Sequence, residues 1–174
     1  MQSCRISLLA HTPRHLRALL AGGDAYESAF AISVADGVSG SLTSPEVSGS
    51  FLARLRDNAA ADPWLDGFGI VQSKEQRLIG LCGYIGPPDA EGVVEIAYSI
   101  APGFEGQGYA TEAARLLIDH AVASGRVRRL RAHTLPEHNA STRVLKKCGF
   151  QFCADVIDQV AGPIWRWERV IEPG

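Results

Sequence analysis

The segment 93–124 constrains the fold most, because it combines a strand, a glycine loop and a helix in succession. Val93–Ile100 is rich in β-branched and aromatic side chains, which favours a strand. Pro102-Gly103 ends that strand, and Gly106-Gln107-Gly108 leads into a helix expected to start at Thr111-Glu112. The apolar positions of the helix follow helical spacing, at Ala114, Leu117, Ile118, Ala121 and Val122.

The two glycines of this loop point to an anion-binding site. The first amides of a helix have no internal partner, and the helix dipole adds partial positive charge near them. Because Gly106 and Gly108 carry no side chains, an anion can approach these amides closely. The loop therefore predicts a phosphate site that needs no lysine.

Length and composition indicate one domain over residues 1–174, with 46% apolar and 21% charged residues. A net charge of −2 gives no indication of a nucleic-acid partner or an anionic membrane surface. No apolar run is long enough to span a bilayer and no export signal is visible, so we expect a soluble cytoplasmic protein. The cysteines show no metal-ligand spacing, so we expect reduced thiols and no metal at Cys4, Cys82, Cys148 and Cys153.

The rest of the chain predicts further elements on either side of this segment. Before it, we expect a strand at 4–10, helices at 13–20, 25–32 and 46–60, a loop at 36–45, and a strand hairpin at 67–72 and 78–85. After it, we expect a strand at 128–135, a helix at 140–148, and a closing hairpin at 150–157 and 164–171. A helix between two strands favours parallel neighbours. The sequence therefore predicts an α/β (α+β mixed) fold, with helices on both faces of a mixed sheet.

Three segments together resemble the GNAT N-acetyltransferase superfamily. Gly106–Ala113 (GQGYATEA) is similar to its acetyl-CoA signature, Glu95–Tyr98 (EIAY) to the strand before it, and Asn139–Phe150 (NASTRVLKKCGF) to a later segment. The branch of ribosomal-protein N-terminal acetyltransferases is most similar, and the resemblance covers residues 78–152. A GxG pair alone is a weak signal, whereas three segments in the family's order are a strong one. The resemblance implies a mostly antiparallel sheet with a splayed strand pair at the coenzyme site.

The resemblance also implies acetyl-CoA as a cosubstrate and a role for each matching residue. The amides of 105–110, with Thr111 beside them, are expected to hold the pyrophosphate. The strand edge at 97–100 is expected to pair with the pantetheine arm, which Asn139 and Ser141 would line. The residues assigned to the coenzyme are thus Ala97, Tyr98, Ser99, Ile100, Glu105, Gly106, Gln107, Gly108, Tyr109, Ala110, Thr111, Asn139 and Ser141.

Two positions depart from the family's pattern. Gly103 stands where the family usually has Gln or Arg, so one side-chain contact to phosphate is missing. Many members also carry a tyrosine as general acid shortly after the Asn/Ser pair. This chain has Arg143, Val144 and Leu145 there, so that role is unfilled.

Acetyl transfer requires that the amine lose its proton, since a lysine ammonium has a pKa of about 10 and an α-amine of about 8. Direct attack on the thioester is the default route, in which the enzyme works mainly by positioning. Glu95 is the first candidate base, because it is an acid in an otherwise apolar strand. The alternative is an ion pair with an arginine such as Arg131. Ser141 could donate to the sulfur or cap its helix.

Other residues keep two interpretations each. His133 could join the site or be a partly buried, hydrogen-bonded histidine, and His138 is expected in a loop. The arginines at 126–131 could hold the 3′-phosphate of the coenzyme or form a solvated, ion-paired face. Five aromatic residues could pack in the core or line the site: Tyr98, Tyr109, Trp64, Trp165 and Trp167. The Trp165/Trp167 pair could instead form a homodimer contact.

The sequence therefore predicts an acetyl-CoA-dependent N-acetyltransferase that moves an acetyl group to a primary amine by direct attack. The acceptor is expected to be a small molecule or a protein N-terminus, enclosed by residues 22–66 and the last hairpin. One alternative is a non-catalytic acyl-CoA-binding module or sensor. A dinucleotide-binding oxidoreductase is disfavoured, because the third position of that glycine fingerprint is Thr111.

Overall fold

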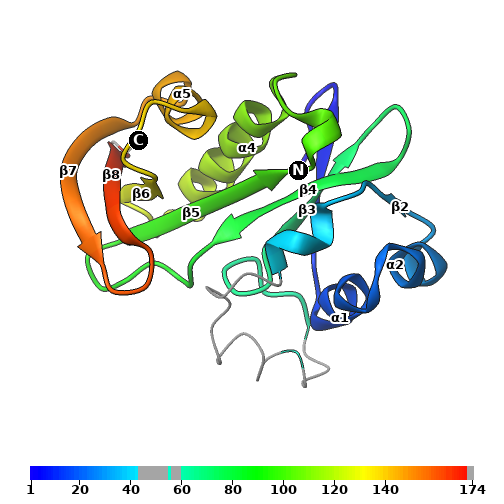
Figure 1. The fold of residues 1–174 in the computed structure, drawn as a ribbon. Helices are drawn as coiled ribbons and strands as arrows, with labels where there is room; N and C mark the ends of the chain where they lie inside the picture. The colour runs from blue at the N-terminus through cyan, green and yellow to red at the C-terminus, as the bar shows by residue number, and fades with distance from the viewer. Residues whose placement is uncertain (43–54, 56–59, 172–174) are drawn as a thin grey trace.

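The computed structural model describes residues 1–42, 55 and 60–171 and forms an α/β fold around one sheet (Figure 1). The strands run in the order β1-β3-β4-β5-β6-β8-β7, and β2 pairs with the start of β4. Among the described strands, only β2–β4 and β5–β6 pair in parallel, which confirms a mixed, mostly antiparallel sheet. The strand bounds are β1 Ile6–Ala10, β2 Ser33–Val34, β3 Phe68–Gln72, β4 Arg77–Tyr84, β5 Val93–Ile100, β6 Arg129–Thr134, β7 Gln151–Asp158 and β8 Gly162–Val170.

Helices cover both faces of the sheet, as predicted. The ring of Phe68 on β3 packs against His120 of α4, whereas a Cβ on Gly69, the next residue, would meet His11 beside α1. Because successive residues of a strand point to opposite faces, α4 and α1 lie on opposite sides of the sheet. The helical bounds are α1 Pro13–Ala21, α2 Gly23–Phe30, α4 Tyr109–Ala123 and α5 Ala140–Lys147, with short 3-10 turns η1 Val38–Leu42 and η2 Pro102–Phe104.

The start of α4 differs from the sequence prediction. The helix begins at Tyr109, and its N-cap is Gly108 rather than Thr111. Gly108 has a φ of 89°, which residues other than glycine rarely adopt. The glycine therefore lets the helix begin directly after the loop. The predicted stripe on α4 is buried at Ala114, Leu117, Ile118 and Ala121, whereas Val122 is 46% exposed and lies outside it.

Other helix predictions had mixed outcomes. Thr12 caps α1 as predicted, because its side chain accepts from the N–H of His15. The two-residue strand β2 was not predicted, since two residues show no alternation of burial. The helix predicted at 46–60 lies outside the described residues, apart from Leu55 and Ala60.

The parallel strands β5 and β6 pair only at one end. Their register runs from Val93 opposite Arg129 to Glu95 opposite Arg131. The remainder of β5 pairs with β4 on its other side, as far as Ile100 opposite Gly80. The second half of β5 thus diverges from β6, which confirms the predicted splayed strand pair. From there the chain enters η2 and then α4, which lies beside α5 (Figure 1).

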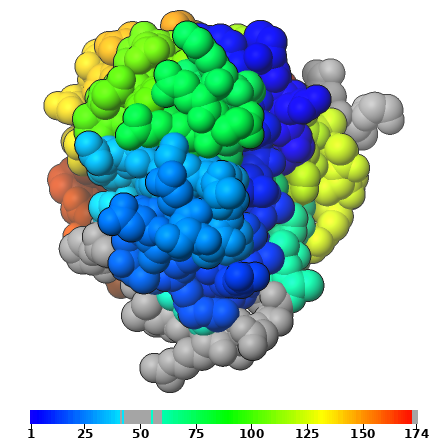
Figure 2. Space-filling view, turned by 90° about the vertical axis from the view of Figure 1, so that its right-hand side faces the viewer, coloured from blue at the N-terminus to red at the C-terminus, as the bar shows by residue number. Residues whose placement is uncertain are grey.

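The N-terminal segment lies at the surface, beside the glycine loop that precedes α4. In the space-filling view the first residues (dark blue) lie against green segments, while α1 and α2 (blue) cover the lower part of the same face (Figure 2). Segments distant in sequence therefore meet near the start of α4, where Arg5 reaches the glycine loop.

Candidate active site

A cleft of about 430 Å³ opens where β5 diverges from β6. It is lined by the end of β5, by the glycine loop with the first turn of α4, and by one face of α5. The segments that carry the family resemblance thus meet in one place. The lining residues are Tyr98, Ser99, Ile100, Phe104, Glu105, Gly106, Gly108, Tyr109, Ala110, Thr111, Ala140, Ser141, Arg143, Val144 and Lys147.

Three of the residues assigned to the coenzyme lie outside this lining. Ala97 lines a second cleft, on the other side of β5. The carbonyl of Gln107 accepts a hydrogen bond from Arg5, and its side-chain amide donates to the carbonyl of Gly103. Asn139 is the N-cap of α5, where its side chain accepts from the N–H of Thr142 at 3.1 Å. The remaining assigned residues all line the first cleft.

The glycine loop gives this cleft an anion-binding wall. Gly106 and Gly108 have φ angles of 71° and 89°. The bond from the N–H of Glu112 to the carbonyl of Gly108 is an early bond of α4. The N–H groups before Glu112 belong to the first turn, where the helix itself offers no acceptor. They are therefore available to an anion, and the helix dipole adds partial positive charge.

Helix α5 forms the opposite wall of the cleft. The sequence left open whether Ser141 caps this helix, but the cap belongs to Asn139. Ser141 lies in the first turn, and its carbonyl accepts a hydrogen bond from the hydroxyl of Tyr98 at 3.3 Å. Burial raises the pKa of the Tyr98 phenol. Tyr98 therefore keeps its proton and joins β5 to α5 across the cleft.

Two basic side chains in the cleft were not assigned to the coenzyme from the sequence. Arg143 and Lys147 line it together with Ala140 and Val144. Positions 140, 143, 144 and 147 follow the i, i+3, i+4, i+7 spacing of one helix face, which is the signal that could have identified them. The arginines at 126–131 do not line the cleft. Among them, Arg129 and Arg131 bind Glu168, and the guanidinium of Arg126 lies over the ring of Trp64.

A second cleft, of about 490 Å³, lies on the other side of β5. The two clefts share Tyr98 and Ser99 in their linings. The second lining is mainly apolar, and Asp66 is its acidic member. From the segment 22–66 it includes Leu42, Leu65 and Asp66; the other lining residues are His11, Leu16, Gly67, Phe68, Leu81, Cys82, Gly83, Tyr84, Ile85, Ala97, Tyr98 and Ser99.

Glu95, the candidate base, lines neither cleft itself, and it precedes Ala97, which lines the second cleft, by two residues on β5. Its carbonyl accepts from the N–H of Ile85, which lines the cleft. Its Oε1 lies 2.8 Å from Nδ1 of His133 on β6. Arg131, the alternative partner considered from the sequence, binds Glu168 instead. The structure thus joins Glu95 to His133, two residues that the sequence analysis considered separately.

The tryptophans have mainly structural contacts. Trp167 is 2% exposed, and its Nε1 donates to the hydroxyl of Thr134 at 3.0 Å. Trp165 packs against His138 and Phe152. The ring of Trp64 lies on Tyr84, and the residue is not part of the lining of either cleft. Within residues 1–42, 55 and 60–171, no cluster of His, Cys, Asp or Glu could hold a metal ion, and no helix could cross a membrane.

Comparisons with known proteins identify the family and the fold of this chain. A family model described as the acetyltransferase (GNAT) domain matches residues 5–151. The uncharacterized N-acetyltransferase YjdG of Bacillus subtilis (strain 168) is 32% identical over 89 residues, which are 51% of this chain and 51% of YjdG. The matched region thus spans about half the length of that relative.

Solved structures share the fold over nearly the whole chain. RimL, a ribosomal L7/L12 alpha-N-protein acetyltransferase solved in complex with coenzyme A, has a TM-score of 0.65 and 19% identity, and the match covers 97% of this chain and 96% of RimL. A GNAT-family acetyltransferase from Bacillus anthracis has a TM-score of 0.62 and 17% identity over 98% of this chain and 97% of that one. Because the family model matches most of the sequence, the chain belongs to the GNAT acetyltransferase family.

Proposed function

We propose that this chain is an acetyl-CoA-dependent N-acetyltransferase, formed as one domain over residues 1–174, that acetylates a primary amine by direct attack. The observation that carries this proposal is that two clefts, on opposite sides of β5, share Tyr98 and Ser99 in their linings. A donor in one cleft and an acceptor in the other would meet at these residues. A transfer between two bound substrates needs such a junction, because the reacting atoms must come within about 3–3.5 Å.

The first cleft fits the chemistry of acetyl-CoA. The amides at the start of α4 suit the pyrophosphate, and the β5 residues 98–100, which line this cleft beyond the pairing with β6, suit the pantetheine arm. Arg143 and Lys147 are the cations of the lining and suit the remaining phosphate charge. RimL, which has the same fold, was solved with coenzyme A. The donor would thus run from α4 and α5 toward Tyr98 and Ser99.

The second cleft would receive the amine. The amine nitrogen attacks the thioester carbon, so that a C–N bond forms, the C–S bond breaks and the sulfur leaves as a thiolate. The nitrogen must release a proton, which the Glu95–His133 pair would accept, because Glu95 lies two residues before the cleft residue Ala97 on β5 and its side chain points to the same face of the strand. Ser141 lines the donor cleft and would donate toward the leaving sulfur. The acceptor is a small-molecule amine or a protein N-terminus, and we place the reaction in the cytoplasm, which the four free cysteines favour.

The unfilled tyrosine position supports a second candidate, a non-catalytic acyl-CoA-binding module. Val144 lines the cleft near that position and cannot donate a proton, and Leu145 is fully buried. A panel of amines, from amino acids and polyamines to peptides with free N-termini, separates the two candidates when free thiol is followed with acetyl-CoA. We expect at least one amine to release thiol in proportion to the acetylated product. Tight binding of acetyl-CoA without thiol release from any amine would favour the binding module.

A further inference from the structure

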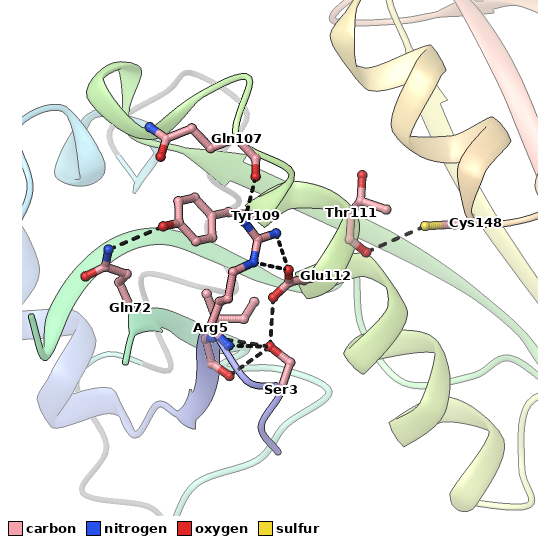
Figure 3. Close-up of polar contacts among 9 residues, drawn as sticks. Ser3, Arg5, Gln72, Gln107, Tyr109, Thr111, Glu112 and Cys148 are labelled. Atoms are coloured by element: carbon pink, nitrogen blue, oxygen red, sulfur yellow. Dashed lines mark hydrogen bonds and ion pairs between the residues drawn. The ribbon is translucent and has the colours of Figure 1, made fainter. Parts of the chain in front are cut away.

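Arg5, just before β1, reaches the glycine loop at the start of α4 (Figure 3). Its Nη1 donates to the carbonyl oxygen of Gln107 at 3.0 Å. Its Nε donates to Oε1 of Glu112 at 2.6 Å, and Nη2 contacts the same carboxylate oxygen. One guanidinium therefore holds both a side chain of α4 and a backbone carbonyl of the loop.

The contact with the Gln107 carbonyl determines where the next amide points. The carbonyl of Gln107 and the N–H of Gly108 belong to one planar trans peptide, so they point in opposite directions. Arg5 holds the carbonyl toward β1. Gly108 lines the coenzyme cleft, whereas Arg5 and Gln107 do not. The N–H of Gly108 is thus directed away from Arg5, on the side where an anion would bind.

This peptide needs an external contact to keep its orientation. Rotating it would change ψ of Gln107 and φ of Gly108, and glycine tolerates both signs of φ. Gly108 stands at a φ of 89°, and a Cβ there would lie 3.1 Å from Nη2 of Arg5. A reversed peptide would present a carbonyl oxygen to the cleft, and an oxygen acceptor would repel a phosphate. Glycine at position 108 therefore leaves space for an anion but does not by itself fix the orientation of the Gln107–Gly108 peptide.

The surrounding contacts fix Arg5 itself. Oε2 of Glu112 accepts from the hydroxyl of Ser3 at 2.8 Å, and the guanidinium lies 5.0 Å from the ring centre of Tyr109 (Figure 3). The hydroxyl of Tyr109 in turn accepts from the side-chain amide of Gln72 at 3.3 Å. Arg5 also balances the charge of Glu112, which would otherwise be an unpaired carboxylate in the first turn of α4. The N-terminal segment thus supports the loop from the side opposite the cleft.

We propose that Arg5 is a positioning residue for the coenzyme, which orients the Gln107–Gly108 peptide so that the amide of Gly108 faces the pyrophosphate. This inference rests on the proposed function, because it requires that the first cleft bind acetyl-CoA. Arg5 acts through the loop and does not line the cleft. It offers a physical reason why the loop can serve with Gly103 at the position where the family usually has Gln or Arg.

The test compares two donors in ¹⁵N-labelled protein followed by NMR. Acetyl-CoA carries the pyrophosphate and S-acetylpantetheine lacks it. In Arg5→Ala we expect acetyl-CoA to bind about tenfold more weakly, while the affinity for S-acetylpantetheine changes less than twofold. The shift of the Gly108 amide on adding acetyl-CoA should shrink as well. Arg14→Ala, which removes a positive charge from the exposed side of α1, is the matched control and should bind both donors as the parent protein does.

Two results would overturn the inference: unchanged affinity of Arg5→Ala for acetyl-CoA, or an equal loss for both donors, which would indicate general damage to the cleft. Should Arg5→Ala fail to fold, Glu112→Gln keeps the shape of the acid and weakens its hold on Arg5. Glu112→Gln should bind acetyl-CoA about threefold more weakly and S-acetylpantetheine as the parent protein does. If the ratio of its affinities for the two donors equals that of the parent protein, the inference is overturned for this variant too. If the parent protein binds neither donor, the proposed function itself fails.

Discussion

Oε1 of Glu95 and Nδ1 of His133 lie 2.8 Å apart and join β5 to β6 at the point where the two strands diverge. A carboxylate can only accept a hydrogen bond, so Nδ1 carries the hydrogen of this contact. The Nε2 atom of His133 is buried and has no hydrogen-bond partner within the described chain. Glu95 and His133 would therefore act as one hydrogen-bonded unit in a proton transfer at this site.

Replacing Glu95 with glutamine should lower turnover by about 10²-fold, because an amide cannot accept the proton of the amine. The pH dependence of turnover should change with it, and affinity for acetyl-CoA should stay nearly the same. Turnover is followed by thiol release across pH with an amine found in the acceptor panel, and affinity by calorimetry. A parental rate at every pH would remove Glu95 from the mechanism.

The role of His133 is tested by a double-mutant cycle with Glu95. If the two side chains act as one unit, His133→Gln should slow turnover, and the double variant should be little slower than Glu95→Gln alone. His138→Gln is the matched control, since His138 packs on Trp165 and lines neither cleft. Fully additive losses would show that the two residues act independently.

Asn139→Ala should weaken acetyl-CoA binding by removing the cap of α5. The side chain of Asn139 accepts from the N–H of Thr142, and loss of such a cap costs about 1 kcal/mol of stability. Asn139→Asp keeps the accepting oxygen but loses the amide donor. Recovery of both the melting temperature and acetyl-CoA affinity in Asn139→Asp would assign the effect to the cap. Recovery of stability alone would show that the amide itself binds the coenzyme.

The stability of the fold should fall in mild acid because of His11. Burial is the main cause that lowers its pKa to about 3, and the nearby His15 adds to it. The unfolded chain binds a proton at His11 below a pKa of about 6.5, whereas the folded chain stays neutral there. The contribution is therefore present above pH 6.5 and is lost as pH falls toward 3. Between pH 7 and 4.5 we expect His11 to account for a loss of roughly 2–3 kcal/mol.

Urea unfolding at several pH values measures this effect. Carboxylates also contribute to acid unfolding, so the parent protein is compared with His11→Gln. The amide does not titrate, and it can still hydrogen-bond to the hydroxyl of Tyr26, which lies 3.0 Å from Nε2 of His11. The variant should lose less stability between pH 7 and 4.5. Identical slopes for the two proteins would contradict a neutral buried His11.

Local patterns were sufficient to predict most of the elements around the donor cleft. The β-branched run at 93–100, the loop glycines and the stripe of α4 each act over a few residues, so a sequence displays them directly. The relation of Glu95 to His133 depends on how β5 and β6 pair, and such a register is not a local property. The contact of Arg5 with Gln107 spans 102 residues of sequence. Contacts of this kind form only when the sheet brings distant segments together, so no periodic pattern in the sequence predicts them.

Calorimetric titration of acetyl-CoA into the parent protein and Gly108→Val tests the donor site most directly. Valine at position 108 would have to adopt a φ of 89°, which a residue with a branched Cβ rarely does, and its side chain would crowd Arg5 beside the glycine loop. We predict one saturable site for the parent protein and no measurable binding for Gly108→Val, with circular dichroism showing that the variant is folded. Absence of binding to the parent protein, or equal affinity in a folded Gly108→Val, would contradict the assignment of this cleft to acetyl-CoA.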